Sequence, residues 1–121
     1  LRRIEEIKAT RRRKYELYQC QLADRPFLKF QRFNPEETNY SYMPVLFETE
    51  DILLRVMERL AGARIYPRRY FHPSLNTIPV LGCREPLPVS EQVARTILCL
   101  PLYQDLDEGE IGRICELIRG L

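Results

Sequence analysis

The fold is decided by residues 40–62, which read YSYMPVLFETEDILLRVMERLAG. The first part, residues 40–47, is rich in aromatic and apolar side chains and predicts a strand. Pro44 cannot donate to a strand ladder, so it predicts an edge position or a bulge. Thr49 is a suitable cap ahead of an acidic first turn, and a helix is predicted from there to Gly62. Its apolar stripe consists of Leu53, Val56, Met57 and Leu60.

Residues 64–71 follow this helix and predict another strand. A strand, helix, strand unit is therefore expected, with the helix across one face of the sheet. The stretch that starts at His72 and Pro73 and extends to Pro88 is rich in proline and contains Gly82. It predicts a long irregular loop, and loops of this length are often functional.

Towards the N-terminus, residues 1–24 carry apolar side chains at roughly helical spacing and predict a long amphipathic helix. Its stripe consists of Ile4, Ile7, Tyr15, Tyr18 and Leu22. Pro26 ends this helix, because proline disfavours the helical conformation of the residue before it. Residues 28–33 predict a short strand that enters a polar turn at residues 34–37.

Towards the C-terminus, Ser90 is the expected cap of a further helix. Its apolar side chains are Val93, Ala94, Ile97 and Leu98. Residues 100–103 predict an extended segment, because a proline is its second residue. Asp107 and Glu110 have the spacing of a capping box ahead of a last apolar helix, which Gly120 closes. Together the elements predict an α+β fold, a small antiparallel or mixed sheet with helices packed on it.

The length of 121 residues fits one domain, or one piece of a larger protein. The chain is 45% hydrophobic and 30% charged, and no apolar run approaches the ~20 residues that cross a bilayer, which excludes a spanning helix. It begins at Leu1 within a charged, helix-like stretch, without an initiator Met or an apolar signal region. We therefore expect a piece of a longer parent protein.

Positive charge is concentrated at the start of the chain, although the net charge is only +2. Residues 1–32 hold ten Lys and Arg against four Asp and Glu, whereas residues 33–121 hold nine against thirteen. The run RRRKY at residues 11–15 has the composition of a nucleic-acid contact, because cationic side chains neutralise phosphates. The alternative is a solvated helix face, or a face that packs on another part of a larger protein.

The four cysteines, at positions 20, 83, 99 and 115, have neither the paired spacing of a zinc site nor the density of a disulfide framework. They are expected to be free thiols, with Cys99 and Cys115 as small core side chains. Free thiols are typical of a reducing compartment, which predicts a cytoplasmic protein.

His72 is the single histidine and follows Arg68, Arg69, Tyr70 and Phe71. No Gly-x-Ser-x-Gly elbow or phosphate-binding glycine loop accompanies it, which disfavours a hydrolase triad and nucleotide hydrolysis. A histidine on a proline-fixed turn is instead expected to line a polar pocket. The guanidinium and aromatic groups beside it suit a ligand with a carboxylate or phosphate. In the alternative, the two arginines point to opposite faces of a strand, one solvated and the other paired with an acidic neighbour.

Three segments in sequence order carry a family resemblance. They are RRYFHPSL at residues 68–75, LPVSEQVA at residues 87–94 and ILCLPLYQDL at residues 97–106. With the tyrosine-rich strand and the helix ending at Gly62, they resemble the C-terminal part of nucleotide-sugar aminotransferases, the DegT/StrS group. The resemblance implies the small domain of a fold-type-I aminotransferase that uses pyridoxal phosphate (PLP). Residues 1–26 would be the linking helix and residues 27–121 the small domain, with the large catalytic domain absent from this chain.

By this resemblance, the parent transfers an amino group, usually from glutamate, to the keto group of a nucleotide-linked deoxysugar. PLP supplies the chemistry, and the lysine that holds it lies in the large domain of the family. Lys8, Lys14 and Lys29 lie in a charged, solvated region of this sequence, so neither bound PLP nor a catalytic residue is expected in this piece alone. The resemblance also implies a homodimer and a role in polysaccharide biosynthesis.

In this family, the turn that matches residues 70–73 faces the active-site cleft. The resemblance therefore implies that Tyr70, Phe71 and His72 contact the substrate and that Arg69 contacts a carboxylate or phosphate. No nucleic-acid or membrane partner is expected under this interpretation. The alternative from a different class is a stand-alone interaction domain whose basic helix binds nucleic acid or a protein partner.

Overall fold

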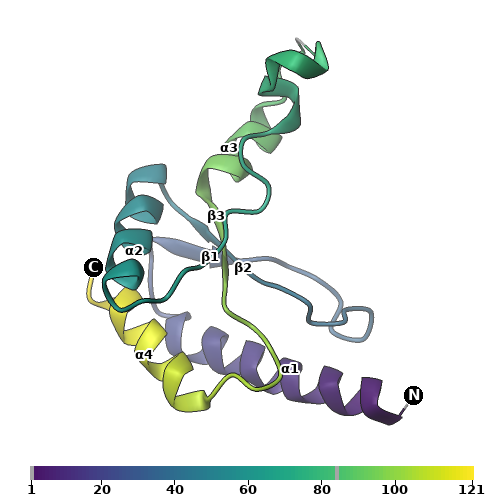
Figure 1. The fold of residues 1–121 in the computed structure, drawn as a ribbon, viewed down its shortest axis with the longest axis vertical. Helices are drawn as coiled ribbons and strands as arrows, with labels where there is room; N and C mark the ends of the chain where they lie inside the picture. Colours follow the sequence, from purple (N-terminus) through teal and green to yellow (C-terminus); the bar gives the residue numbers. More distant parts are fainter. Residues whose placement is uncertain (1, 84) are drawn as a thin grey trace.

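The computed structural model describes residues 2–83 and 85–121. Four helices and three strands make up an α+β fold, as predicted (Figure 1). The helices are α1 (Arg2–Leu22), α2 (Glu50–Gly62), α3 (Pro88–Thr96) and α4 (Glu108–Arg119). The strands are β1 (Leu28–Phe30), β2 (Met43–Phe47) and β3 (Ile97–Leu100). Two short 3₁₀ turns, η1 (Leu75–Thr77) and η2 (Pro79–Leu81), lie in the segment predicted as an irregular loop.

The three strands form one antiparallel sheet in the order β1-β2-β3. Pro44 lies in the central strand opposite Cys99, but it occupies an edge position there, as predicted, because β1 does not reach it. β1 ends at Phe30, opposite Val45, and Pro44 therefore has a neighbouring strand only on the β3 side. A proline is tolerated at such a position because no strand pairs with it on its other side.

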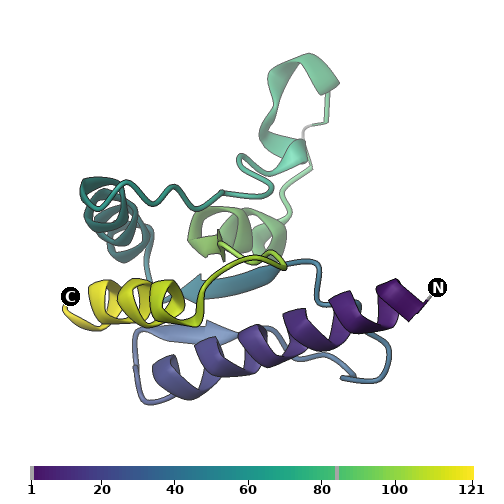
Figure 2. The same cartoon turned by 60° about the horizontal axis from the view of Figure 1, so that its bottom comes forward.

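One face of the sheet is buried under helices. Figure 2 shows α1 and α4 side by side on one side of the sheet, with α3 on the other. The inward side chains of β2 and β3 are fully or almost fully buried: Met43, Val45, Phe47, Leu98 and Leu100. The helices contribute Leu22, Leu53, Val56, Leu60, Ile111, Ile114 and Ile118 to the same core. This core lies entirely within the 121 residues, which gives the chain its own source of folding energy.

Two of the three predicted N-terminal helix caps are confirmed. Thr49 caps α2 and its side chain accepts a hydrogen bond from the Ile52 amide, and Asp107 caps α4 and accepts one from the Gly109 amide. The predicted cap at Ser90 is wrong, because α3 begins two residues earlier at Pro88, after the cap residue Leu87. Proline suits the first helical position, where an amide hydrogen would have no partner.

Two predicted elements near the sheet are wrong. Residues 64–71 do not form a strand, and only Arg68 pairs, in an isolated bridge to Cys99. The third strand is instead β3, which contains Ile97 and Leu98, two residues predicted to continue a helix. The apolar spacing of these residues fits a helix and a strand equally well. Pairing with β2 favours the strand, because it buries Leu98 completely.

The stripe of α1 is buried only towards its C-terminal half. Tyr15, Tyr18 and Leu22 are buried, whereas Ile4 is 59% exposed. Lys14 is also buried, at 4% exposure, so its prediction as a solvated lysine is wrong. Its ammonium donates to the backbone carbonyls of Tyr103 and Gln104, which replaces the water it loses.

Two arginines in the basic run of α1 form ion pairs at the surface. Arg12 pairs with Glu16 at 2.9 Å, and Arg13 pairs with Glu108 of α4 at 3.1 Å. Lys14 is buried, whereas the Arg12 and Arg13 side chains remain 44% and 70% exposed in these ion pairs.

All four cysteines are unpaired, as predicted, and Cys115 is buried in the core. Cys99 is half-buried on the outer face of β3. Among the described residues, no helix is long and apolar enough to cross a membrane.

Truncation of a core leucine tests whether this core stabilises the chain. Leu60 is fully buried in α2, whereas Leu54 on the same helix is 47% exposed. We expect Leu60→Ala to lower the free energy of unfolding by about 2–5 kcal/mol, because it opens a cavity. Leu54→Ala should change it by less than about 1 kcal/mol. Urea titrations followed by circular dichroism measure both, and equal losses would contradict this assignment of the core.

Candidate functional site

The turn at residues 69–73 leaves the sheet beside β3. Arg68 forms two backbone hydrogen bonds with Cys99, from the Arg68 amide at 3.1 Å and from the Cys99 amide at 2.8 Å. The chain then turns at Tyr70 and His72, through two cis peptide bonds, and enters a segment, residues 74–83 and 85–89, that projects from the body of the molecule (Figure 1). The turn is thus anchored to the sheet on one side and open on the other.

Arg69 is engaged within the fold. Its Nη2 donates to Glu50 Oε1 at 2.8 Å and to the Arg95 backbone carbonyl at 3.1 Å, and its side chain is only 17% exposed. His72 Nε2 lies 3.9 Å from the same Glu50 oxygen. The hydrogen bond from Arg69, followed by the charges of Arg69 and His72, lowers the pKa of Glu50 below its ordinary value of 4.5. This arrangement matches the alternative in which one arginine pairs with an acidic neighbour.

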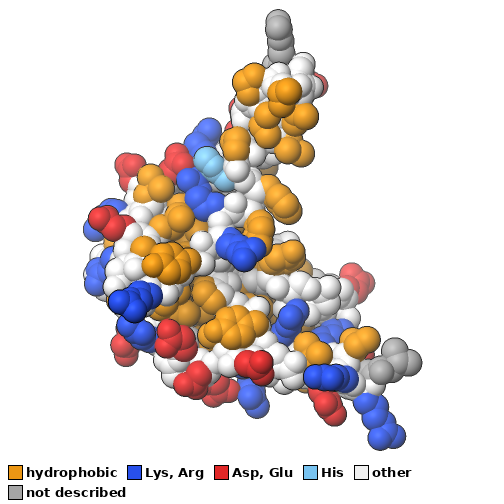
Figure 3. All heavy atoms as spheres, in the orientation of Figure 1, with side chains coloured by type: hydrophobic (Ala, Val, Ile, Leu, Met, Phe, Trp, Pro, Cys, Tyr) orange, Lys and Arg blue, Asp and Glu red, His pale blue; other side chains and the backbone are white. Residues whose placement is uncertain are grey.

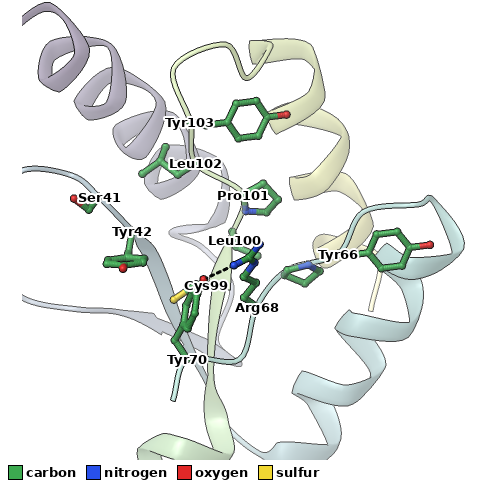
Figure 4. Close-up of a pocket in the computed structure, with 11 residues that line it drawn as sticks. Ser41, Tyr42, Tyr66, Arg68, Tyr70, Cys99, Leu100, Pro101, Leu102 and Tyr103 are labelled. Carbon is green, nitrogen blue, oxygen red and sulfur yellow. Dashed lines mark hydrogen bonds between the residues drawn. The ribbon is translucent and has the colours of Figure 1, made fainter. Parts of the chain in front are cut away.

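Arg68 points to the other side of the turn, into a hollow of about 360 Å³ (Figure 4). Its Nη1 donates to the Tyr70 hydroxyl at 2.7 Å. We call this hollow the tyrosine pocket, because Tyr42, Tyr66, Tyr70 and Tyr103 all line it. The remaining lining residues are Ser41, Pro67, Cys99, Leu100, Pro101 and Leu102. Burial raises the pKa of the Cys99 thiol, which makes it a poor nucleophile at neutral pH.

The structure distributes the four predicted site residues over two sides of the turn. Tyr70 lines the tyrosine pocket and also a second hollow of about 460 Å³ that Phe71 shares with the start of the projecting segment. His72 lines a third hollow of about 230 Å³ beside Glu50. Phe71 is 79% exposed, and Arg69 is held by Glu50. Only Tyr70 therefore belongs to the pocket that Arg68 enters.

Sequence reasoning missed four residues of this region. Tyr42 and Tyr103 lie far apart in sequence, and no local spacing places them together. Lys14 and Tyr18 of α1 support the pocket from behind: the Tyr18 hydroxyl donates to the Pro101 carbonyl at 2.8 Å, and Lys14 donates to the two carbonyls named above. The available signals in the sequence were the two tyrosines of residues 40–42, of which Tyr42 is exposed and Tyr40 is buried, and the segment LPLY at residues 100–103, which begins at the last residue of β3.

The projecting segment exposes apolar side chains. Figure 3 shows hydrophobic side chains gathered over it. They include Leu75, Val80, Leu81, Leu87 and Val89, with exposures from 45% for Leu87 to 88% for Val80. Soluble proteins seldom leave such a patch open unless it contacts something else.

Comparison with known proteins assigns the family. The model of the DegT/DnrJ/EryC1/StrS aminotransferase family matches residues 1–119. The chain belongs to this family. The resemblance inferred from the three sequence segments is thereby confirmed, and so is the small-domain fold.

The relatives of this family member are longer proteins. The dTDP-4-amino-4,6-dideoxy-D-glucose transaminase of Escherichia coli is 33% identical over 90 residues, which cover 69% of this chain and 24% of that protein. The aminotransferase TlmJ from Streptoalloteichus hindustanus superposes with a TM-score of 0.89 at 25% identity, over 99% of this chain and 33% of TlmJ. DesI, solved in the presence of its TDP-sugar product, has a TM-score of 0.81 at 28% identity, over 95% of this chain and 31% of DesI. This DegT/StrS family member thus spans a minor part of each.

The buried lysine among the described residues of this family member does not fit the lysine of a PLP site. A lysine that holds PLP must be activated by desolvation or by neighbouring cations. Lys14 is the buried lysine of the chain, and its ammonium is already bound by two backbone carbonyls. Its two acceptors lie in the segment before α4, and Lys14 does not line the hollows that Arg68 and His72 line.

The Glu50–Arg69 ion pair predicts a pH dependence of stability. Because the pKa of Glu50 is lowered in the fold, the pair stabilises the folded state above pH 4.5, and this contribution is lost as pH falls through the lowered pKa. We expect the urea midpoint of the unmodified chain to fall more steeply below about pH 4.5 than that of Glu50→Gln. Glu58→Gln on the same helix is the control and should keep the unmodified slope. Identical slopes for Glu50→Gln and the unmodified chain would contradict the role of this pair.

Proposed function

We propose that this chain is the C-terminal small domain of a longer PLP-dependent aminotransferase. The enzyme transfers an amino group from glutamate to the keto group of a nucleotide-linked deoxysugar. The observation that carries the proposal is the family match over residues 1–119, with a dTDP-sugar transaminase of which the chain covers 24%. The family match alone does not define the substrate, because one fold serves many functions. The dTDP-sugar transaminase relative supplies the indication of the substrate.

The exposed apolar side chains support the proposal that a further domain packs against this chain. Ile4 in the first turns of α1 and the apolar side chains of the projecting segment lie open to water. A large domain that packs on the start of α1 and on this segment would cover them. We propose that this domain supplies the lysine and the phosphate contacts of PLP, because the ammonium of the buried Lys14 is already bound by two backbone carbonyls.

Within the proposed enzyme, the turn forms part of the wall of the substrate cleft. Tyr70, Phe71 and His72 present aromatic and imidazole groups on its open side. Arg69, bound to Glu50, acts as a positioning residue that ties the turn to α2 and to the Arg95 carbonyl. The proposal includes a cytoplasmic homodimer and a role in polysaccharide biosynthesis, as the family resemblance implies.

The longer protein encoded by the reading frame that contains residues 1–121 tests this function. We expect it to bind PLP in a borohydride-trappable form and to transfer the amino group of glutamate to dTDP-4-keto-6-deoxyglucose. Chromatography of the nucleotide products measures the transfer, and the 121-residue chain mixed with PLP is the control, which should form no stoichiometric adduct. A reading frame without a large PLP-binding domain, or an adduct at a single lysine of this chain, would contradict the proposal.

Substitutions in the turn test its place beside the substrate. In the longer protein, Phe71→Ala and His72→Ala should each lower kcat/KM for the nucleotide-linked sugar about tenfold, which corresponds to the loss of about 1.4 kcal/mol of contact. Both side chains are exposed in this chain, so the substitutions should leave its folding intact. Leu54→Ala, on the outer face of α2, is the matched control and should keep the unmodified value. Unchanged kinetics in both turn variants would place the substrate elsewhere.

A further inference from the structure

Tyr15 belongs to the core, but its hydroxyl has no hydrogen-bond partner. The residue is only 2% exposed, and its buried hydroxyl makes no hydrogen bond within the part of the chain that the structure describes. Burial, together with the neighbouring Tyr40, raises the pKa of Tyr15 to about 12, so the hydroxyl keeps its proton at neutral pH. A buried donor without an acceptor costs free energy. Its missing partner is a water molecule or a ligand group.

Tyr15 lines a hollow of about 290 Å³, which we call the α1 hollow. Helix α1 contributes Tyr15 and Glu16 to it, and the segment after β1 contributes Arg32, Phe33 and Tyr40. The α1 hollow shares no lining residue with the tyrosine pocket or with the two hollows at the turn. It is therefore a separate candidate site.

Three aromatic rings form a fixed wall of the α1 hollow. Tyr15 is in edge-to-face contact with Phe33 and Tyr40, with ring centres 5.3 Å and 5.4 Å apart, and Phe33 contacts Tyr40 at 5.8 Å. Tyr40 has a φ of 53°, in the left-handed region that bulky residues rarely adopt. Such a conformation persists only where the surrounding structure holds it, and Tyr40 is only 3% exposed. A preformed wall lowers the ordering cost of binding.

Opposite charges line the α1 hollow without pairing with each other. Arg32 takes part in no ion pair within residues 2–83 and 85–121. Glu16 pairs with Arg12 through Oε1 alone, and both side chains stay about half exposed, at 56% and 44%. An exposed pair of this kind is weak, so Glu16 remains able to bind a second cation. A carboxylate and a guanidinium beside an apolar wall are complementary to a zwitterion with an apolar side chain.

We propose that the α1 hollow binds a free α-amino acid with an apolar or aromatic side chain. The carboxylate of the ligand contacts Arg32 and accepts a hydrogen bond from the Tyr15 hydroxyl. Its ammonium contacts Glu16, and its side chain packs against Phe33 and Tyr40. The volume of about 290 Å³ lies at the lower end of the range of about 300–1,000 Å³ for small-molecule sites, which suits a ligand of this size. The site goes beyond the proposed function and does not depend on it.

Nuclear magnetic resonance titrations of the 121-residue chain test this site with L-phenylalanine, 3-phenylpropionate, which lacks the ammonium, and 2-phenylethylamine, which lacks the carboxylate. We expect L-phenylalanine to bind most tightly, with shifts confined to residues 15–19 and 31–40. Arg32→Gln should weaken L-phenylalanine and 3-phenylpropionate about tenfold and leave 2-phenylethylamine within about twofold. Glu16→Gln should weaken L-phenylalanine and 2-phenylethylamine and leave 3-phenylpropionate within about twofold.

Tyr15→Phe separates a ligand role of the hydroxyl from a structural one, because it keeps the ring and removes only the unpartnered group. We expect the urea midpoint of the free chain to stay the same or rise, since a buried unsatisfied donor is lost. Affinity for L-phenylalanine should fall about fivefold. Unchanged affinity in this variant would show that the hydroxyl serves only a structural water, and it would overturn the assigned contact.

Arg55→Gln is the matched control, since Arg55 is an exposed arginine on α2 outside the α1 hollow, and it should bind L-phenylalanine like the unmodified chain. An unchanged amide spectrum outside the hollow confirms that each variant is folded. The proposal is overturned if millimolar L-phenylalanine causes no shifts, if the shifts lie elsewhere, or if Arg32→Gln binds it with unchanged affinity. Either result leaves the proposed transaminase function untouched.

Discussion

The antiparallel pairing of β2 with β3 is the interaction on which the rest of the structure depends. It places Val45 opposite Leu98 and so directs one continuous apolar face towards α1 and α4. The outer edge of β3 is then available to a single residue, Arg68, through its bridge to Cys99. Because this bridge fixes where residues 69–73 leave the sheet, the position of the turn follows from the packing of the core.

Polar contacts connect the buried core to the turn and to the pocket at the surface. Lys14 and Tyr18 use the buried face of α1 to hold the carbonyls of the segment after β3, which forms one wall of the tyrosine pocket. Glu50, in the first turn of α2, holds Arg69 on the opposite side of the turn. The two neighbouring arginines thus have different roles: Arg69 is a structural partner, and Arg68 remains open towards the pocket. In the proposed enzyme this arrangement presents a preformed surface to the nucleotide-linked sugar.

Sequence reasoning predicted the elements whose signals are local and missed those that depend on distant partners. The apolar stripe and the Thr49 cap were sufficient for α2, because a helix satisfies its own hydrogen bonds. The spacing of Ile97 fits the end of a helix as well as the start of a strand. It forms a strand because its backbone pairs with β2. The same limit applies to the site. The turn was found from its own residues, but the contacts of Lys14 depend on the segment before α4, and the pairing of Arg69 depends on α2.

The central claim is that the pocket wall is preformed by the sheet, and amide hydrogen exchange of the 121-residue chain tests it most directly. The Arg68 and Cys99 amides each donate to the other residue's carbonyl, outside the regular ladder. The account predicts that both amides exchange as slowly as those of the β2 and β3 ladder, because the bridge opens only when the sheet does. Exchange of the Arg68 amide as fast as that of the exposed residues 80–82 would contradict a preformed wall.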